Sequence, residues 1–527
     1  MCVFYRMLRF FIILFFTAFP SLSGYAALSP DQLFARIRDV YYVNKDVNLN
    51  GDTLVFHSGS KLRFKGGVIA NGGIIFDSTR IENRPKFRNC SYNGDIIIKK
   101  IDDRNFTSSD DLGTLRFLLK NTINLGIRCE INRDYTINMK DVPGSVGILS
   151  FRNIDSGADI HFNHHTISNT HPFLPNQIKP VLRFFNVKNV TIHDCKFHDT
   201  DENNTHYFEE STGCSFIQCI GDCESINLLN CSQENGDCIL RSAGYGLEEQ
   251  PTRGIFNSVI KVKSFNSGYG LVLSCGDSLT IDIETNSPHR GFYCTGVSNS
   301  TINYSGYNPV ETKTHILVKD AVYRYVDESG NASLDMKGCS NLTINAYVPV
   351  LNSGEQILCL QSYGSGLKEG ADFRFRKQKC HHQNIDFTAR VKVYPKEGYY
   401  IISRVASDSG ALDEDDMIGC KVTGFRIHDI HHLGGQARRY MCTIDTHADV
   451  DMCVENCSAD KDGAFRFQII GSASGRMILN NSQCGDILVR KKTSGDFYIE
   501  RKGKKHFDGQ LSYINDESKR NLVKIIQ

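Results

Sequence analysis

Three stretches near the middle of the chain decide the fold: Ser258-Val259-Ile260-Lys261-Val262, Ser278-Leu279-Thr280-Ile281 and Ser300-Thr301-Ile302. Each begins with a small polar residue and continues with apolar residues in alternation, which is typical of a short β-strand with one buried face. The second residues of the first two stretches are 20 positions apart, and those of the last two are 22 apart. The pattern therefore repeats with a period near 22 residues.

The same pattern recurs on both sides of this centre. Its other members are Asn189-Val190-Thr191-Ile192, Ser225-Ile226-Asn227-Leu228, Asn341-Leu342-Thr343-Ile344 and Asn384-Ile385-Asp386-Phe387. The spacing of 33 residues from Ile226 to Val259 fits one coil with a loop, whereas later spacings near 40 fit either two coils or one coil with an insertion. Short strands at this period, separated by Asn, Gly, Ser and Asp turns, predict a parallel β-solenoid.

Composition narrows the possible partners. The 527 residues include 60 Lys and Arg against 59 Asp and Glu, a net charge of +1. Nucleic-acid binders normally carry a marked basic excess, so no nucleic-acid partner is expected. Hydrophobic residues at 40% and charged residues at 23% are ordinary for a folded protein.

Residues 1–26 are expected to be a cleaved signal peptide. Arg6 and Arg9 precede the apolar run Phe10–Phe16, and the small residues Gly24 and Ala26 follow at the spacing of a cleavage site. The apolar run is too short to span a bilayer comfortably. We therefore expect a secreted or periplasmic protein without stable membrane insertion.

Residues 27–145 are expected to form short-strand coils and a capping helix, followed by the main β-helix over residues 146–510 and a C-terminal tail over 511–527. Ser109 or Asp110 can cap the helix. The apolar residues of its buried face are Leu112, Leu115, Leu118, Leu119 and Ile123.

The helix that starts at Ser108-Ser109-Asp110-Asp111, the strand Tyr135-Thr136-Ile137 and the coils on both sides occur in an order that resembles the right-handed parallel β-helix proteins of the pectate-lyase superfamily. The stretches Asn50–Leu54 and Lys65–Gly72 are similar to the N-terminal coils of secreted β-helix proteins of gut Bacteroidetes. The resemblance implies an all-β, right-handed parallel β-helix whose N-terminal capping region contains one short helix. Such β-helices include lyases, hydrolases, epimerases and non-catalytic adhesins.

Equivalent turns of successive coils stack into a column, which brings distant residues together. Aligning the strands brings Glu234–Asp237, Asn266–Gly270 and Asn286–Gly291 into register, with Phe197–Asp201 on the coil before them. Each residue alone also fits a turn-forming role, because Asn, Asp and Gly tolerate left-handed backbone. From their clustering, the predicted catalytic residues are Asp199, Asp237, Tyr269, His289 and Arg290. The predicted substrate-binding residues, on flanking strands and loops, are Lys263, Glu209, His198 and Arg253.

Two chemistries fit this edge. A glycoside hydrolase needs two carboxylates, for which Asp199 with Asp237, or Asp237 with Glu209, are candidates. A polysaccharide lyase needs a base and a positive group beside a uronate carboxylate, and Arg290 could supply the charge.

For the lyase, the base would be Tyr269, His289 or Lys263. The stretch Lys263-Ser264-Phe265-Asn266 followed by His289-Arg290-Gly291 is faintly similar to the Lys…Arg pattern of calcium-assisted alginate and chondroitin lyases. Ca²⁺ is therefore the one cofactor that the sequence leaves open, and no metal ligands are predicted.

The expected function is that of an exported, monomeric, carbohydrate-active protein that cleaves an acidic or complex polysaccharide as a lyase or hydrolase. The alternative is a non-catalytic glycan-binding or adhesion β-helix on a surface. The chain has no Trp, which slightly favours the binder because indole rings are common sugar-stacking platforms, although its 22 Tyr can replace them.

The 19 cysteines, 18 without Cys2, would suggest a disulfide framework in an exported chain. However, Cys219, Cys275, Cys294 and Cys339 recur near one strand position of the repeat. This recurrence predicts mostly reduced, inward-facing cysteines. One or two bridges, such as Cys453–Cys457, are also expected.

Overall fold

The computed structural model describes residues 40–138, 149–170, 178–199, 213–243, 253–287, 290–306, 313–319, 321–326, 332–362, 381–393, 397–407, 421–432, 438–445, 449–459, 465–470, 473–490, 496–504, 510–514 and 523–526. The expected signal peptide lies outside these ranges. In the part of the chain so described, no helix is long and apolar enough to cross a membrane. The chain divides into two compact units: unit 1 is Met1–Asn138 with Ser156–Ser168, and unit 2 is Met139–Asp155 with Asn169–Gln527.

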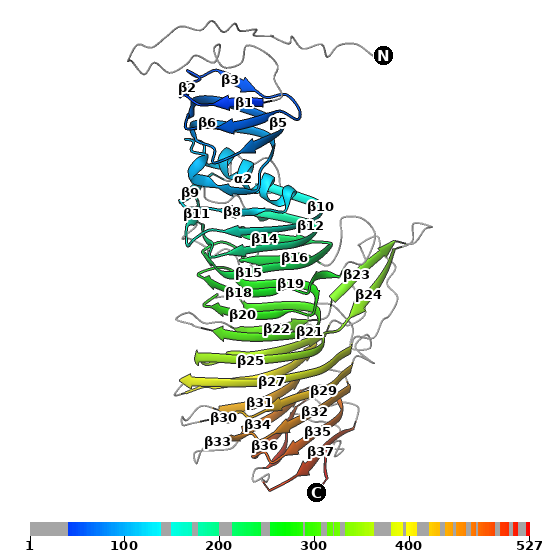
Figure 1. Cartoon of the computed structure of the whole chain (residues 1–527). Helices are drawn as coiled ribbons and strands as arrows, with labels where there is room; N and C mark the ends of the chain where they lie inside the picture. Colours follow the sequence, from blue (N-terminus) through cyan, green and yellow to red (C-terminus); the bar gives the residue numbers. More distant parts are fainter. Residues whose placement is uncertain are drawn as a thin grey trace, which may run out of the picture. The chain divides into compact units, whose positions relative to one another are not determined.

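Unit 1 begins with short parallel strands, drawn in blue in Figure 1. The strands β1 (Val40–Val43), β4 (Lys61–Phe64), β5 (Ile69–Glu82) and β6 (Phe87–Ile97) are neighbours in that order. The strands β2 (Val47–Asn48) and β3 (Thr53–Val55) also pair with β5. Their inward side chains are mostly aromatic and aliphatic, and form the core of this unit.

Helix α2 (Asp111–Leu125) follows these coils, as predicted. The carboxylate of Asp110 accepts a hydrogen bond of 2.8 Å from the backbone N–H of Gly113, so Asp110 is the N-cap. Gly126 ends the helix in the left-handed conformation, with φ of 62°. Of the predicted apolar face, Leu112 is only partly buried, and the fully buried members are Leu115, Leu118, Leu119 and Ile123.

Unit 2 is a parallel β-helix, which confirms the predicted all-β fold class (Figure 1). Its strands form two main faces. Face 1 contains the second half of β12 (Ile178–His193), β13 (Lys196–Asp199), β15 (Asp222–Glu234), β18 (Val259–Phe265), β20 (Thr280–Thr285), the second half of β21 (Arg290–Gly306), β25 (Ser340–Val350), β27 (His381–Val393), β29 (Lys421–His428), β32 (Asp449–Glu455), β35 (Ser474–Asn480), β37 (Phe497–Lys502) and β39 (Val523–Ile526).

Face 2 runs beside it along the same coils. It contains the first halves of β12 and β21, together with β14 (Gly213–Ile220), β16 (Leu240–Ala243), β19 (Tyr269–Asp277), β22 (Thr314–Lys319), β26 (Gln356–Ser362), β28 (Tyr399–Ser407), β31 (Arg438–Asp445), β34 (Phe465–Ile470), β36 (Cys484–Arg490) and β38 (Leu511–Ile514). Because β38 and β39 pair with β36 and β37, the ladder continues into the segment that we expected to be a tail.

Part of the core of unit 2 is a column of apolar side chains on face 1, with one residue from each of seven coils. Its members are all fully buried and directly paired: Leu228, Ile260, Ile281, Ile302, Ile344, Phe387 and Ile427. Ile302 and Ile344 are direct neighbours, so the spacing of 42 residues between them is one coil with an insertion. That insertion includes the antiparallel hairpin of β23 (Ala321–Val326) and β24 (Ala332–Lys337).

The register differs by one residue from the simplest alignment of the repeats, because Val259 pairs with Thr280 and not with Leu279. The observed period in this part is therefore 21 residues from Ile260 to Ile281 and again to Ile302.

A ladder of asparagines supports one turn of the coils. Asn299, Asn341 and Asn384 have left-handed backbone, with φ of 50°, 53° and 52°. The side-chain amide of Asn341 donates to the Oδ1 of Asn299 at 2.8 Å, and that of Asn384 donates to the Oδ1 of Asn341 at 2.9 Å. Asparagine combines tolerance of this backbone with a side chain that reaches the next coil.

Replacing Asn341 separates these two roles. We expect Asn341→Ala to lower the free energy of unfolding by about 2–3 kcal/mol, from the left-handed backbone and the lost hydrogen bonds together. Asn341→Gly loses only the hydrogen bonds, at about 1 kcal/mol. Guanidinium denaturation measures both, with the exposed Thr343→Ala as control. Equal losses for Ala and Gly would show that the backbone conformation contributes nothing.

The cysteines form part of the core. The 15 cysteines whose side chains the structure describes are free, and all but the partly exposed Cys453 are buried. Burial raises the pKa of the Cys231 and Cys442 thiols to about 12, so both stay protonated. The expected Cys453–Cys457 bridge is absent, because both residues are free. The prediction of reduced core cysteines is confirmed for the described residues.

Thiol titration tests this state. In protein unfolded in guanidinium without reductant, we expect a chromogenic disulfide reagent to react with at least 15 thiols per chain. In the folded protein few should react, because buried, protonated thiols are poor nucleophiles. The same titration after reduction gives the total. A count well below 15 before reduction would contradict the free-thiol core.

Candidate functional site

The turn column predicted from the repeats exists in unit 2. The backbone N–H of Tyr269 donates to the carbonyl of Asp237 at 2.8 Å, and Tyr269 pairs with Arg290 on the next coil. Asp237, Tyr269 and Arg290 therefore follow one another along one edge, between face 1 and face 2. The predicted residues His289 and Glu209 lie outside the described ranges.

Asp237 is held in a buried ion pair that the sequence reasoning did not identify. Its side chain is 0% exposed, and Arg241 on β16 binds both carboxylate oxygens, Nη2 to Oδ1 at 2.8 Å and Nε to Oδ2 at 3.0 Å. Burial alone lowers the pKa of Arg241, but the charge of Asp237 offsets this and the pKa is raised. The Arg241 guanidinium lies 5.8 Å from the centre of the Tyr269 ring.

The other predicted residues in the described ranges differ in burial and in their hydrogen-bond or ion-pair partners. Asp199 is fully buried, and its Oδ1 accepts a hydrogen bond from the amide of Asn169 at 2.9 Å. His198 lies 3.4 Å from the carboxylate of Glu234. Arg253 is exposed, and its backbone N–H donates to the carboxylate of Asp222 at 2.7 Å.

A carboxylate that is fully buried and bound to a neighbour cannot reach a polymer outside the solenoid. The geometry therefore does not favour Asp199 with Asp237 as the two carboxylates of a hydrolase. Both side chains instead stabilise the turns from which they come.

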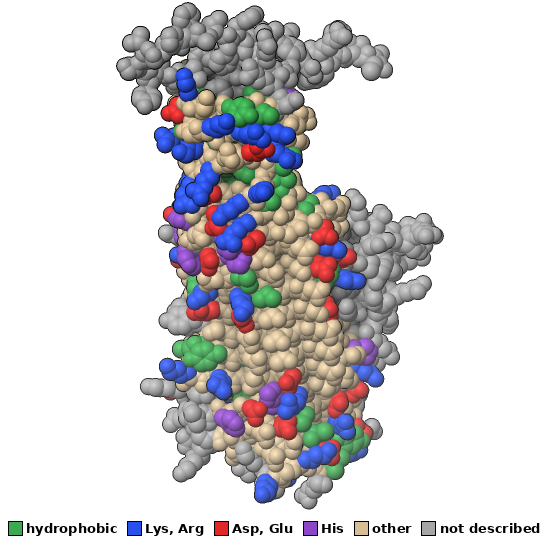
Figure 2. Space-filling model, in the orientation of Figure 1, with side chains coloured by type: hydrophobic (Ala, Val, Ile, Leu, Met, Phe, Trp, Pro, Cys, Tyr) green, Lys and Arg blue, Asp and Glu red, His purple; other side chains and the backbone are tan. Residues whose placement is uncertain are grey.

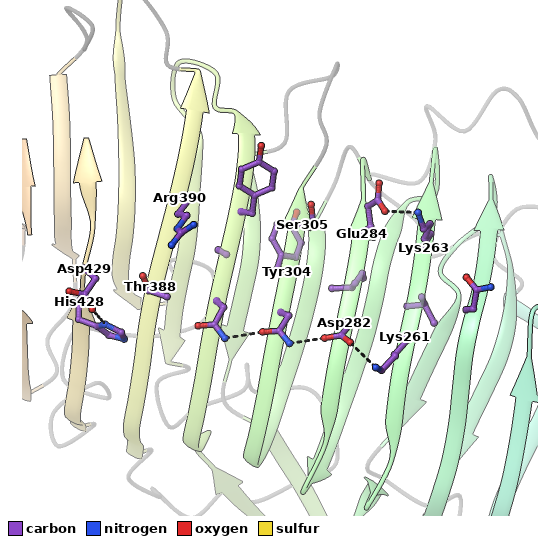
Figure 3. A pocket seen from close by; sticks show the side chains of 17 residues that line it. Lys261, Lys263, Asp282, Glu284, Tyr304, Ser305, Thr388, Arg390, His428 and Asp429 are labelled. Atoms are coloured by element: carbon purple, nitrogen blue, oxygen red, sulfur yellow. Dashed lines mark hydrogen bonds and ion pairs between the residues drawn. The ribbon is translucent and has the colours of Figure 1, made fainter. Parts of the chain in front are cut away.

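A groove lies on the outer surface of face 1 (Figure 3). It has a volume of about 840 Å³ and crosses β18, β20, β21, β25, β27 and β29. Two rows of outward side chains line it, each with one residue per strand. The upper row is Lys263, Glu284, Ser305, Tyr347 and Arg390. The lower row is Lys261, Asp282, Asn303, Asn345 and Thr388. We call this the face-1 groove.

The β18 end of the groove is occupied by ion pairs. Lys263 lies 2.8 Å from Glu284, and Lys261 lies 3.5 Å from Asp282 (Figure 3). From Asp282 a chain of amides continues along the lower row. Asn303 donates to the Asp282 carboxylate at 2.6 Å, and Asn345 donates to Asn303 at 2.9 Å. Lys263, a predicted substrate-binding residue, thus lines the groove.

The other end of the groove has a different character. The Tyr347 side chain is 42% exposed, and Arg390 is its direct neighbour on β27. Arg390 is exposed, and no ion pair joins it to a carboxylate among the residues that the structure describes. His428 Nδ1 lies 2.7 Å from the Asp429 carboxylate, and this hydrogen bond is the main reason that the pKa of Asp429 is lowered. This end therefore combines an exposed phenol with an available positive charge.

The groove suits an extended polymer. Successive side chains in a row are about 4.8 Å apart, since they come from neighbouring parallel strands. Amide and hydroxyl groups at the centre can donate and accept hydrogen bonds, and the exposed tyrosine ring offers an apolar surface with a polar tip.

The repeat pattern contained a signal for this groove. Tyr347 lies three residues after Ile344, and Arg390 lies three residues after Phe387, so both point outward at the same position of the repeat. Of the residues in the two rows, only Lys263 was among the predicted site residues.

Comparison with known proteins identifies no family for this chain. No protein-family model and no curated protein matches the chain. Among solved structures, the A-module of the mannuronan C-5 epimerase AlgE6 of Azotobacter vinelandii is similar, with 9% sequence identity and a TM-score of 0.33. The match covers 81% of this chain and 98% of that one. A likeness this low supports no conclusion about activity.

The ion pair of Asp237 and Arg241 is expected to be structural. Arg241→Met leaves a buried carboxylate without its cation, which should lower the free energy of unfolding by about 3–5 kcal/mol at pH 7. Urea denaturation at pH 7 measures the effect.

The double variant Arg241→Met/Asp237→Asn is the matched control. It removes the uncompensated charge, so it should be more stable than Arg241→Met at pH 7. Equal losses of stability in the single and the double variant would contradict the role of the carboxylate.

Proposed function

We propose that the protein binds an acidic polysaccharide along the face-1 groove and cleaves it by elimination. The observation that carries this proposal is the exposed Tyr347 directly beside Arg390, at one end of a groove otherwise lined by amides, hydroxyls and ion pairs. A uronate carboxylate has a counter-charge in Arg390, and the polymer backbone has hydrogen-bonding partners along both rows.

The state of the groove carboxylates favours elimination over hydrolysis. A hydrolase needs one carboxyl group that stays protonated and a second that stays ionised. Asp282 and Glu284 are each held in an ion pair with a lysine, and the hydrogen bond with His428 lowers the pKa of Asp429. None of the three is therefore a free carboxyl group that could serve as the general acid.

In the proposed reaction, Arg390 faces the uronate carboxylate and stabilises the negative charge that develops there. The Tyr347 side-chain oxygen acts as the base and removes the proton from the carbon next to that carboxylate. The electron pair left behind forms a carbon–carbon double bond as the glycosidic carbon–oxygen bond breaks. The departing oxygen takes the proton back from Tyr347, so the enzyme ends unchanged.

Non-catalytic glycan binding is the second candidate. It is favoured by the continuous chain of hydrogen bonds from Asp282 through Asn303 to Asn345. This chain holds a regular row of polar side chains in place, and such a row can bind a glycan without a catalytic group. Export to the periplasm or medium, a monomeric state and a requirement for Ca²⁺ stay predictions.

A polysaccharide panel with two groove variants tests both candidates. The assay follows the absorbance of unsaturated uronate together with new reducing ends. We expect Tyr347→Phe to lower kcat by about 10²–10⁴-fold with little change in KM, because only the proton-transfer group is lost. Arg390→Gln should weaken binding as well as turnover. Arg438→Gln, an exposed arginine that does not line the groove, is the control.

The outcomes separate the candidates. Reducing ends without uronate absorbance would contradict elimination. Binding that depends on Arg390, with neither signal, would support the non-catalytic candidate. Neither binding nor cleavage of any acidic polysaccharide would refute the proposal as a whole.

A further inference from the structure

A second pocket lies within unit 1 and contains no residue of the face-1 groove. It has a volume of about 1120 Å³ and is formed by the ends of β5 and β6, the turn between them, and the start of β7 (Lys100–Asp102) and the 3₁₀ helix η1 (Asp103–Asn105). Its cationic lining residues are Arg80, Arg84, Lys99, Lys100 and Arg104. Figure 2 shows Lys and Arg side chains on the visible surface of this unit. We call this cavity of unit 1 the basic pocket.

The local backbone fixes where two of these cations point. Asn83 has left-handed backbone with φ of 68°, and its amide donates to the carbonyl of Phe64 at 3.1 Å. Pro85 restricts the backbone on the other side of Arg84. Arg84 therefore projects from an anchored turn. Arg80 lies on β5 between its neighbours Lys61 on β4 and Ile97 on β6.

Both acidic residues of the pocket are already paired. Glu82 is bonded to Arg63, which lowers the pKa of Glu82, and Asp102 accepts from Arg104 at 2.6 and 2.9 Å, which lowers the pKa of Asp102. Their negative charge is thus compensated.

The cations of the pocket differ in whether a carboxylate lies beside them. Lys100 lies 3.2 Å from Glu130 and is also compensated. Among the described residues, Arg84 and Lys99 have no carboxylate partner, whereas Arg80 acts on Glu82 and, after Arg63, helps to lower its pKa. The five cations that line the pocket outnumber its two carboxylates, so the lining carries an excess of positive charge.

We propose that the basic pocket binds a segment of an anionic saccharide through its sulfate or carboxylate groups. The guanidinium groups of Arg80 and Arg84 present paired N–H donors that match such oxyanions. The side chain of Ile97 is 40% exposed and offers an apolar surface to a sugar ring. The volume is far larger than a single inorganic anion requires, and it is in the size class of sites that hold organic ligands.

Titration of the full chain with labelled oligosaccharides tests this site. The probes are polygalacturonate and dextran sulfate oligosaccharides, with neutral dextran as the negative probe and fluorescence anisotropy as the readout. The chain also carries Arg390→Gln and Tyr347→Phe, so that the face-1 groove contributes little. In this background, Arg80→Gln/Arg84→Gln/Lys99→Gln should weaken binding of an anionic probe at least about tenfold at low salt.

The control triple variant Lys45→Gln/Lys65→Gln/Arg88→Gln removes the same charge from exposed positions of unit 1 outside the pocket. We expect it to weaken binding by less than about twofold, because well-solvated distant charges are screened. Equal weakening by the two triple variants would overturn the proposal and indicate a general charge effect. The proposal would also be overturned if the Arg390→Gln/Tyr347→Phe variant, with its basic pocket intact, no longer bound the anionic probes. That result would assign all binding to the face-1 groove. Preference for anionic lipid vesicles over both anionic probes would likewise overturn the proposal.

Discussion

The structure of unit 2 depends on one constraint: each coil places its side chains directly over those of the previous coil. Parallel pairing fixes neighbouring strands about 4.8 Å apart, and the two-residue period of a strand fixes which side chains point inward. The column from Ile260 through Ile281 and Ile302 to Ile344 satisfies this constraint with apolar contacts between like side chains. A shift of one residue would bury the outward polar residues and expose this column, so the register is strongly specified.

The same register arranges everything outside the core. The outward rows of the face-1 groove exist because Lys263, Glu284 and Ser305 occupy equivalent positions on successive coils. The asparagine ladder occupies equivalent turns for the same reason. Insertions such as the β23–β24 hairpin lengthen a coil without disturbing its neighbours, since Ile302 and Ile344 still pair directly. The solenoid can therefore vary its loops while it keeps a continuous outer surface.

The sequence was sufficient for the fold but only partly so for the site. Repeated strands predicted the solenoid, and the apolar spacing after Asp110 predicted the helix, because both are local patterns of buried and exposed residues. Local patterns also placed Asp237, Tyr269 and Arg290 in one column. They did not reveal that Arg241 buries and neutralises Asp237, because that contact depends on how the chain bends between face 1 and face 2. The groove could not be predicted for a related reason. Tyr347 and Arg390 are neighbours because the residues between them make one coil, and the sequence alone left open whether they make one coil or two.

The composition of the groove rows bears on whether the surface only binds or also reacts. A surface that needs affinity alone can repeat one side chain on every coil, as the lower row nearly does with Asn303 and Asn345. The upper row does the opposite, since lysine, glutamate, serine, tyrosine and arginine occur once each on consecutive strands. A polymer shifted along this row by one coil would meet different chemistry at every position. The upper row therefore distinguishes one register of the polymer from the next, which a reaction at a single bond requires and simple adhesion does not.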